Sequence, residues 1–339
     1  MILETISHAR AGLIGNPSDG YFGKTLSFTL TNFSAKVTMW ESPDIQFLPN
    51  PADDAIFKDL DQLMNEVLLY GYYGGIRLLK ATTKVFVDYC HRQNITLPRR
   101  NFSVRYESDI PRLVGMAGSS AICTAMFKSL TKFFEVDISK KIMPTLCLNA
   151  ETQELNLQAG LQDRVAQVYN GVMYMDFDEE FVTSRGYGRY TRVQKELLPN
   201  LYVAYDPTRA EVSGHYHRNL KVLFEQQDVK VVDAMGQFAE YAKAFYDYLL
   251  DDKTDKLPGL IDANFDLRDS IFNVAEENRR MVMAARDAGA SAKFAGSGGA
   301  IVGTYEDETM FGQLTDNLEK IGCRVIKPQI PDEGLTTDP

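Results

Sequence analysis

The chain has 339 residues, of which 45% are hydrophobic and 24% are charged, which is the composition of a folded globular protein and not of a disordered, collagen-like or disulfide-stapled one. At this length two domains are expected rather than one. Lysine and arginine number 36 against 46 aspartates and glutamates, so the formal net charge of −10 repels a phosphate backbone or an anionic membrane. We therefore expect neither nucleic acid nor a membrane as a partner.

The cysteines and the N-terminal residues both indicate a cytoplasmic protein. The first 13 residues are interrupted by Glu4, His8 and Arg10 before any apolar run of signal-peptide length, and no later stretch reaches the roughly 18 apolar residues that span a bilayer. The cysteines form no CxxC pair, which is typical of reduced thiols and excludes a zinc ribbon. They are Cys90, Cys123, Cys147 and Cys323.

Strand and helix patterns alternate along the first half. Residues 25–40 are rich in Thr, Phe and Val and alternate, which predicts one or two strands, and a loop follows over residues 44–54. From residue 55 to about residue 94 the apolar residues recur at spacings of three and four, with a break at Gly74-Gly75, so two helices are predicted. Residues 101–108 alternate like a strand, and beyond a glycine-rich loop the apolar spacing of residues 122–133 predicts another helix.

The second half repeats this mixture without an internal repeat. We predict strands at residues 172–176, 201–205, 292–295, 300–305 and 323–327, long helices at residues 232–250 and 267–288, a shorter helix at residues 308–321, and a frayed end over the last nine residues. The domain boundary is expected in the loops between about residues 177 and 199.

The stretch from Pro111 to Ala121 is the strongest chemical signal. It reads Pro-Arg-Leu-Val-Gly-Met-Ala-Gly-Ser-Ser-Ala and stands where a strand leads into a helix. Free backbone N–H groups and the positive end of the helix dipole make such a loop a phosphate site, although a serine-capped helix start has the same pattern. Gly23-Lys24-Thr25 is not part of a P-loop, because Ser18 stands where the first glycine is required and a strand pattern follows.

Three further stretches place polar residues around turns. Residues 10–19 form a short apolar strand that ends in an Asn-Pro-Ser-Asp-Gly turn. Glu151 and Asp163 flank a glycine turn, which suits a metal ligand paired with a base. Residues 293–299, Lys-Phe-Ala-Gly-Ser-Gly-Gly, form a turn whose glycines permit positive φ or close approach to a ligand. Taken singly each stretch also fits ordinary turn or surface chemistry, and the absence of GxGxxG argues against a dinucleotide fold.

Taken together and in this order, the four stretches resemble those of the GHMP kinases, the superfamily of galactokinase, homoserine kinase, mevalonate kinase and phosphomevalonate kinase. Three motifs are similar in sequence to those of the plant-type glucuronokinases. They are Gly15-Asn-Pro-Ser-Asp19, Asn149-Ala-Glu151 and Ala159-Gly-Leu-Gln-Asp163. The resemblance implies an α+β fold of two domains. The N-terminal one, of the ribosomal protein S5 domain 2 type, would span residues 1–185, and a C-terminal α/β-sandwich domain with the third motif would span residues 186–339.

The resemblance also implies a role for individual residues. Asp163 would accept or orient the proton of the sugar hydroxyl, and Arg10 would keep that carboxylate ionised and face the γ-phosphate. Mg²⁺ would bind Ser119 and Glu151, with Ser120 and Glu154 as the competing positions. The implied ATP-binding residues are Gly115, Ala117, Gly118, Ser119, Ser120, Ala121, Gly296, Ser297 and Gly298.

The acceptor implied is a sugar, because Asp19 matches the sugar-binding aspartate of the galactokinase-like branch; Tyr174 and Arg112 are further substrate-binding candidates. A uronic acid adds a carboxylate, which a bidentate arginine recognises best. The arginines available are Arg112, Arg164, Arg185, Arg189 and Arg192.

The implied reaction is transfer of the ATP γ-phosphate to the anomeric hydroxyl of D-glucuronate, giving D-glucuronate 1-phosphate for UDP-glucuronate synthesis. Two alternatives stay open. One is another acceptor, such as galacturonate, galactose or L-arabinose, and the other is a sensor on the same fold that binds ATP and sugar without turnover. The sequence leaves the oligomeric state open.

Overall fold

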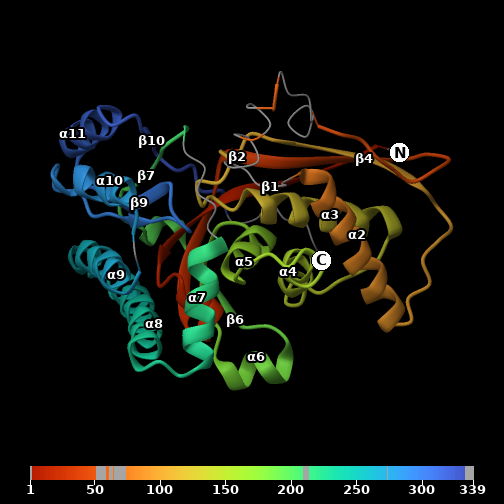
Figure 1. Cartoon of the computed structure of the whole chain (residues 1–339), viewed down its shortest axis with the longest axis horizontal. Coiled ribbons are helices and arrows are strands. Elements are labelled where there is room, and N and C mark those ends of the chain that lie inside the picture. Colours follow the sequence, from red (N-terminus) through yellow and green to blue (C-terminus); the bar gives the residue numbers. More distant parts are fainter. Residues whose placement is uncertain are drawn as a thin grey trace.

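A long antiparallel pair of strands, β1 (Ile2–Ile14) and β2 (Lys24–Glu41), crosses the computed structural model, with most helices of the first half on one side and the C-terminal elements at one end (Figure 1). The structure describes residues 2–50, 59–60, 64, 74–208, 214–272 and 274–332, with the backbone alone for residues 214–219. Of the two helices predicted between residues 55 and 94, the first lies almost entirely outside the described residues, and the second is α2 (Gly75–Arg92).

The first sheet is built around β2. β1 pairs with one edge of β2 along its whole length, and the opposite edge is shared by β4 (Phe102–Ser108) at one end and β5 (Val172–Asp176) at the other. β3 (Gln46–Phe47) and β6 (Arg189–Val193) complete the order β3-β4-β2-β5-β6, with β1 beside β2. The strand pattern over residues 25–40 is therefore confirmed as a single strand.

Helices of the first half bury their apolar faces against this sheet. α3 (Gly118–Phe134) and α5 (Gln162–Tyr169) pack side by side on β1 and β2, and α2 and α4 (Met143–Thr152) pack on α3. Ala121 and Ala125 of α3 have no exposed surface, and their small side chains let the helix lie close to the strands. This packing places the first turns of α3 and α5 at the same end of the molecule as the glycine-rich turn of the second sheet.

The second sheet has the order β10-β7-β9-β8. Its strands are β7 (Leu201–Tyr205), β8 (Lys293–Phe294), β9 (Ala300–Thr304) and β10 (Arg324–Ile326). α6 (Glu179–Arg185) connects β5 to β6 of the first sheet. The described helices that follow β7 are α7 (Gly214–Glu225), α8 (Val229–Leu250), α9 (Leu257–Ile271), α10 (Glu276–Arg286) and α11 (Glu308–Glu319).

The single helix predicted over residues 267–288 is wrong, because two helices occupy this region. α9 ends at Ile271, after which Phe272 is extended, and α10 begins at Glu276. Glu276 and Glu277 favour a helix start at this point, because carboxylates are stabilised at the positive end of the helix dipole. The chain passes from the first sheet to the second between Val193 and Leu201, so β6 belongs to the first sheet although it follows the predicted boundary at residue 185.

Both halves of the fold are tied to the β1–β2 pair. The Gly12 amide of β1 donates to the Ala295 carbonyl at 2.7 Å, next to the glycine-rich turn. On β2, the Thr31 amide donates to the Gln329 carbonyl at 2.8 Å, and Asn32 Oδ1 accepts from the Gln329 amide at 2.7 Å. The four cysteines are buried as free thiols. Within the described ranges, no helix combines the length and apolar character needed to cross a membrane.

Candidate active site

The predicted phosphate loop joins β4 to α3 and turns sharply just before the helix. Gly115 and Ala117 have φ of 73° and 63°, both in the left-handed region. Ser120 is buried and its Oγ donates to the Ala117 carbonyl, whereas Ser119 Oγ donates to Glu151 Oε1 at 2.7 Å. In the described part of the chain no side chain caps α3, so the N–H groups of its first turn remain for a ligand.

The glycine-rich turn of the second sheet lies directly against this loop. A Cβ atom at Gly296 would collide with the Gly115 carbonyl, and one at Gly115 would lie 2.9 Å from the Gly298 carbonyl oxygen, so only glycines allow the two backbones to meet. Arg268 of α9 fixes the turn by donating to the carbonyls of Gly296 and Ser297, each at 2.9 Å. The structure therefore brings the predicted nucleotide-binding stretches of both halves together.

A continuous chain of charged groups starts at the phosphate loop. Glu151 of α4 accepts from Ser119 through Oε1 and forms an ion pair with Arg164 through Oε2. Arg164 also reaches Asp163 Oδ2 at 3.3 Å, and Asp163 Oδ1 lies 2.5 Å from Arg10 Nη2. Glu151 and Arg164 are each 2% exposed and Arg10 is 3% exposed, whereas 18% of the Asp163 side chain is exposed. The least buried of these four charged groups is thus the predicted proton acceptor.

Arg10 sits where the two halves meet. Its Nη1 donates to the Ala295 carbonyl at 2.5 Å and to the Gly115 carbonyl at 3.3 Å, while Nη2 pairs with Asp163. One guanidinium therefore joins β1, the phosphate loop, the glycine-rich turn and the first turn of α5. Only 3% of Arg10 is exposed, so its donors keep fixed directions.

The Ser119 hydroxyl and the Glu151 carboxylate form a pair of hard oxygen donors at the start of α3. Glu154, the competing position, turns away to an ion pair with Lys84 at 2.9 Å. Mg²⁺ prefers oxygen ligands and is usually held by one or two protein groups together with nucleotide phosphates, so this pair fits it. Among the described residues, no group of three or more His, Cys, Asp or Glu side chains is arranged to hold a metal without such phosphates.

Asp19 lies beside the charged chain on the short helix η1 (Ser18–Tyr21). Its Oδ2 accepts from the Gln162 amide N–H at 3.2 Å and its Oδ1 accepts from Gln162 Nε2 at 3.0 Å. Burial and the nearby carboxylate of Asp163 raise the pKa of Asp19 to about 7. The predicted sugar-binding and catalytic carboxylates are thus neighbours at the first turn of α5.

The arginines considered for a sugar carboxylate are widely separated. Arg164 is buried in the charged chain, and Arg192 donates to the Tyr169 and Asn170 carbonyls at the far end of α5. Arg189 lies over the Phe181 ring, 4.2 Å from its centroid, and Arg185 is exposed at the end of α6. Arg112 is exposed in the segment that leads into the phosphate loop.

Tyr174 does not reach the charged chain. It pairs opposite Leu26 in β2 and stacks on Tyr246 of α8 with ring centroids 4.2 Å apart. Its neighbours Met173 and Met175 point the other way and pack against α5. Since side chains alternate across a strand, Tyr174 lies on the face of the sheet opposite to α5.

Comparisons with known proteins agree with this arrangement. A family model described as the GHMP kinases N terminal domain matches residues 77–171. The chain is 41% identical over 306 residues to Glucuronokinase 1 of Arabidopsis thaliana, a match that covers 88% of this chain and 84% of that protein. The chain belongs to the GHMP kinase family.

Solved structures show that this GHMP kinase has the expected fold. The galactokinase of Lactococcus lactis, complexed with galactose, matches with a TM-score of 0.77 over 97% of this chain and 93% of that one at 14% identity. The phosphomevalonate kinase of Streptococcus pneumoniae, in complex with phosphomevalonate and AMPPNP, matches with a TM-score of 0.76 over 98% and 100% at 14% identity. The predicted α+β GHMP kinase fold is confirmed.

Sequence reasoning missed three residues of this GHMP kinase site. The sequence offers Arg164 only as one of five candidates for the sugar carboxylate, whereas in the structure it bridges Glu151 and Asp163. Gln162 and Lys293 were given no role. Lys293 is 1% exposed, and its ammonium donates to three neutral oxygens, one of them Asn16 Oδ1 at 2.5 Å; burial and the charges of Arg268 and Arg10 lower its pKa. The only sequence signal for these residues is their place inside the motifs.

Proposed function

We propose that this GHMP kinase transfers the γ-phosphoryl group of ATP to the anomeric hydroxyl of D-glucuronate, giving D-glucuronate 1-phosphate and ADP. The observation that carries the proposal is the buried chain from Ser119 through Glu151, Arg164 and Asp163 to Arg10, which starts at the phosphate loop. The choice of acceptor is supported by the 41% identity to Glucuronokinase 1.

Asp163 is the residue we assign to the proton of the sugar hydroxyl. The sugar oxygen forms the new bond to the γ-phosphorus, the bond from that phosphorus to the leaving oxygen of ADP breaks, and the hydroxyl proton passes to Asp163 Oδ2 or is oriented by it. Arg10 holds Oδ1 at 2.5 Å and Arg164 reaches Oδ2 at 3.3 Å, so the two guanidinium groups fix the position and the plane of the carboxylate. The Arg10 guanidinium also places positive charge near the transferring group.

Ser119 and Glu151 are the residues we assign to Mg²⁺, which would neutralise phosphate charge when it binds with ATP. The N–H groups at the start of α3 and the backbone around Gly296, Ser297 and Gly298 would hold the phosphates, since both loops present backbone rather than side chains. Rigid contact between these loops positions the nucleotide relative to Asp163.

Asp19 is the residue we assign to the sugar hydroxyls. A carboxylate can accept about four hydrogen bonds, and Gln162 supplies two, so two remain for a sugar. For the carboxylate of glucuronate we assign Arg112, which lies three residues before Gly115 in the segment that leads into the phosphate loop.

The test is ADP release with Mg²⁺-ATP and a panel of glucuronate, galacturonate, galactose and L-arabinose. We expect turnover with glucuronate and a loss in kcat of about 10²-fold or more in Asp163→Asn, because the amide cannot take the proton. Asp316→Asn on the exposed face of α11 is the matched control. Arg112→Ala should raise the KM for glucuronate and leave that for ATP unchanged.

Each other outcome has its own meaning. If a different sugar turns over, the catalytic assignment stands and the acceptor is wrong. If ATP and sugar bind without turnover, the protein is a sensor. If Asp163→Asn is folded and as active as the wild type, Asp163 is not the proton acceptor.

A further inference from the structure

Gln162 holds the carboxylate of Asp19 from two sides at once. Its main-chain N–H donates to Oδ2 at 3.2 Å and its side-chain Nε2 donates to Oδ1 at 3.0 Å, across 143 positions of sequence. Gln162 is 6% exposed and is the first residue of α5, directly before Asp163. A two-point contact fixes both the position and the plane of a carboxylate.

A third residue sets the orientation of the Gln162 side chain. Ser27 of β2 donates its hydroxyl to Gln162 Oε1 at 3.0 Å, and Ser27 is fully buried. With Oε1 engaged by a donor, the NH₂ group of the amide must face Asp19. A glutamate could not replace Gln162 in its charged form, because it would set a second carboxylate against Asp19.

Gly160 lies against Oδ2 of Asp19, the oxygen that also accepts from the Gln162 main-chain N–H. A Cβ atom at Gly160 would collide with Asp19 Oδ2, so the carboxylate lies tightly against the segment that leads into α5. Asp19 is therefore held by the main chain of this segment at Oδ2 and by the Gln162 side chain at Oδ1. Its two remaining lone-pair positions have one fixed orientation relative to Asp163.

From these contacts we infer that Gln162, held in turn by Ser27, is a positioning residue for the acceptor sugar. By fixing Asp19 against the first turn of α5, Gln162 sets the place of the sugar hydroxyls bound by Asp19 relative to Asp163, the next residue along the chain. The inference rests on the proposed function of Asp19 as a sugar-binding residue. According to this inference, the side-chain amide of Gln162 sets the distance between the sugar-binding Asp19 and the proton acceptor Asp163.

The charges around Asp19 explain why an uncharged residue with two N–H donors, Gln162, contacts it. Burial and the charge of Asp163 raise the pKa of Asp19, so two carboxylates share a poorly solvated place. Hydrogen bonds donated to the ionised carboxylate lower the pKa of Asp19. Removing the side-chain donor should therefore weaken sugar binding and also make Asp19 harder to ionise.

The experiment compares wild type with Gln162→Met, which keeps the length of the side chain and removes its donor. We expect the KM for the sugar to rise about 10- to 100-fold while the KM for ATP stays within about twofold. The hydrogen bond that is lost holds the charged Asp19, which we assign to the sugar and not to ATP. Gln313→Met on the exposed face of α11 is the matched control, and it should change neither constant.

Ser27→Ala shows whether the contacts act in series. Alone it should raise the KM for the sugar by less than Gln162→Met, and added to Gln162→Met it should have no further effect, because its hydroxyl acts through the amide. Effects that simply add, or a KM for ATP that rises as much as that for the sugar, would mean a structural role only and overturn the inference.

A second measurement needs no substrate. The titration of Asp19, followed by NMR of ¹³C-labelled aspartate carboxyls and assigned with Asp19→Asn, should move to higher pH in Gln162→Met. An unchanged titration overturns the inference. If the wild type fails to phosphorylate glucuronate, the proposed function fails, while this titration and the KM for any other sugar of the panel still decide the role of Gln162.

Discussion

The two ends of α5 use arginine in opposite ways. At the first turn, Arg164 is 2% exposed and pairs with the carboxylates of Glu151 and Asp163. Past the last turn, Arg192 is exposed, and it donates to the main-chain carbonyls of Tyr169 and Asn170 at 2.7 and 2.6 Å. The first arrangement gathers ionised groups out of water, and the second satisfies the free carbonyls that every helix end leaves.

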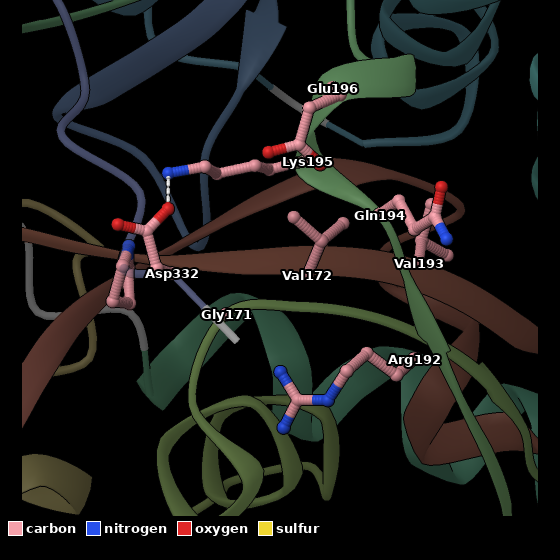
Figure 2. Close-up of a pocket in the computed structure, with 9 residues that line it drawn as sticks. Gly171, Val172, Arg192, Val193, Gln194, Lys195, Glu196 and Asp332 are labelled. Atoms are coloured by element: carbon pink, nitrogen blue, oxygen red, sulfur yellow. Dashed lines mark hydrogen bonds and ion pairs between the residues drawn. The ribbon is translucent and has the colours of Figure 1, made fainter. Parts of the chain in front are cut away.

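The residues around the two ends of α5 also differ in how deeply their charged groups are buried. Next to Arg192 lies a cavity of about 410 Å³ between the edge of β5 and β6 and the C-terminal residues Pro331 and Asp332 (Figure 2). The charged pair in it, Lys195 with Asp332, keeps contact with solvent, since 32% and 77% of the two side chains are exposed (Figure 2). The predicted catalytic residues all lie at the other end of α5. The comparison teaches that burial of paired charges, rather than the presence of a cavity with charged walls, distinguishes the active site that we propose.

Arg164→Met should have the largest effect on the molecule. It leaves Glu151 and Asp163 without their shared cation in a buried place, and breaking such a pair costs about 3–5 kcal/mol of unfolding free energy. Urea unfolding followed by circular dichroism measures the loss, and kcat should fall as well. The double variant Glu151→Gln/Arg164→Met should regain part of the stability but not the activity, because it removes the unpaired charge together with the carboxylate that we assign to Mg²⁺. A loss no larger than that in Arg192→Met would contradict the comparison.

Asp19→Asn should stabilise the protein at alkaline pH while it weakens sugar binding. The pKa of Asp19 is raised to about 7, so between pH 4 and 7 the folded state keeps a proton that the unfolded chain releases, and wild-type stability falls as pH rises through that window. The full shift corresponds to about 4 kcal/mol, from which the weaker hydrogen bonding of asparagine subtracts about 1. We expect a gain of about 1–3 kcal/mol at pH 8 and little at pH 4.

Unfolding in urea at both pH values checks this prediction. A gain that is equal at pH 4 and pH 8 would show that Asp19 carries no penalty for its charge. In the wild type, the same titration should raise the KM for the sugar as pH falls below about 7, because a protonated Asp19 accepts fewer hydrogen bonds.

The sequence predicted those parts of the site that belong to local motifs. Ser119 and Glu151 were paired as oxygen donors, and the structure places them 2.7 Å apart; Arg10 was paired with Asp163, and the structure places them 2.5 Å apart. The two glycine-rich stretches also meet as expected. In each case the pairing followed from the resemblance to the GHMP kinases, because each stretch taken singly also fits ordinary turn or surface chemistry.

The remaining contacts depend on distances that no local pattern encodes. Gln162 meets Asp19 and Ser27 only because β1 and β2 lie under α5, and Arg164 is buried because α4 packs on α5. An arginine beside a catalytic aspartate has the same sequence whether it faces solvent or the core. The predicted helix over residues 267–288 was wrong for a related reason, since a continuing apolar spacing hides a break of four residues between α9 and α10.

Arg192→Met should have the smallest effect. Its two hydrogen bonds at the exposed end of α5 and its charge near the negative end of the helix dipole together stabilise the fold by about 0.5–1 kcal/mol. α5 has eight residues and rises about 1.5 Å for each, so Arg192 acts roughly 12 Å from Asp163, and kcat and both KM values should stay unchanged. Steady-state kinetics with glucuronate decides the matter. A tenfold rise in the KM for glucuronate would mean that Arg192 binds the sugar carboxylate. The sugar site would then lie at the end of α5 to which we give only a structural role.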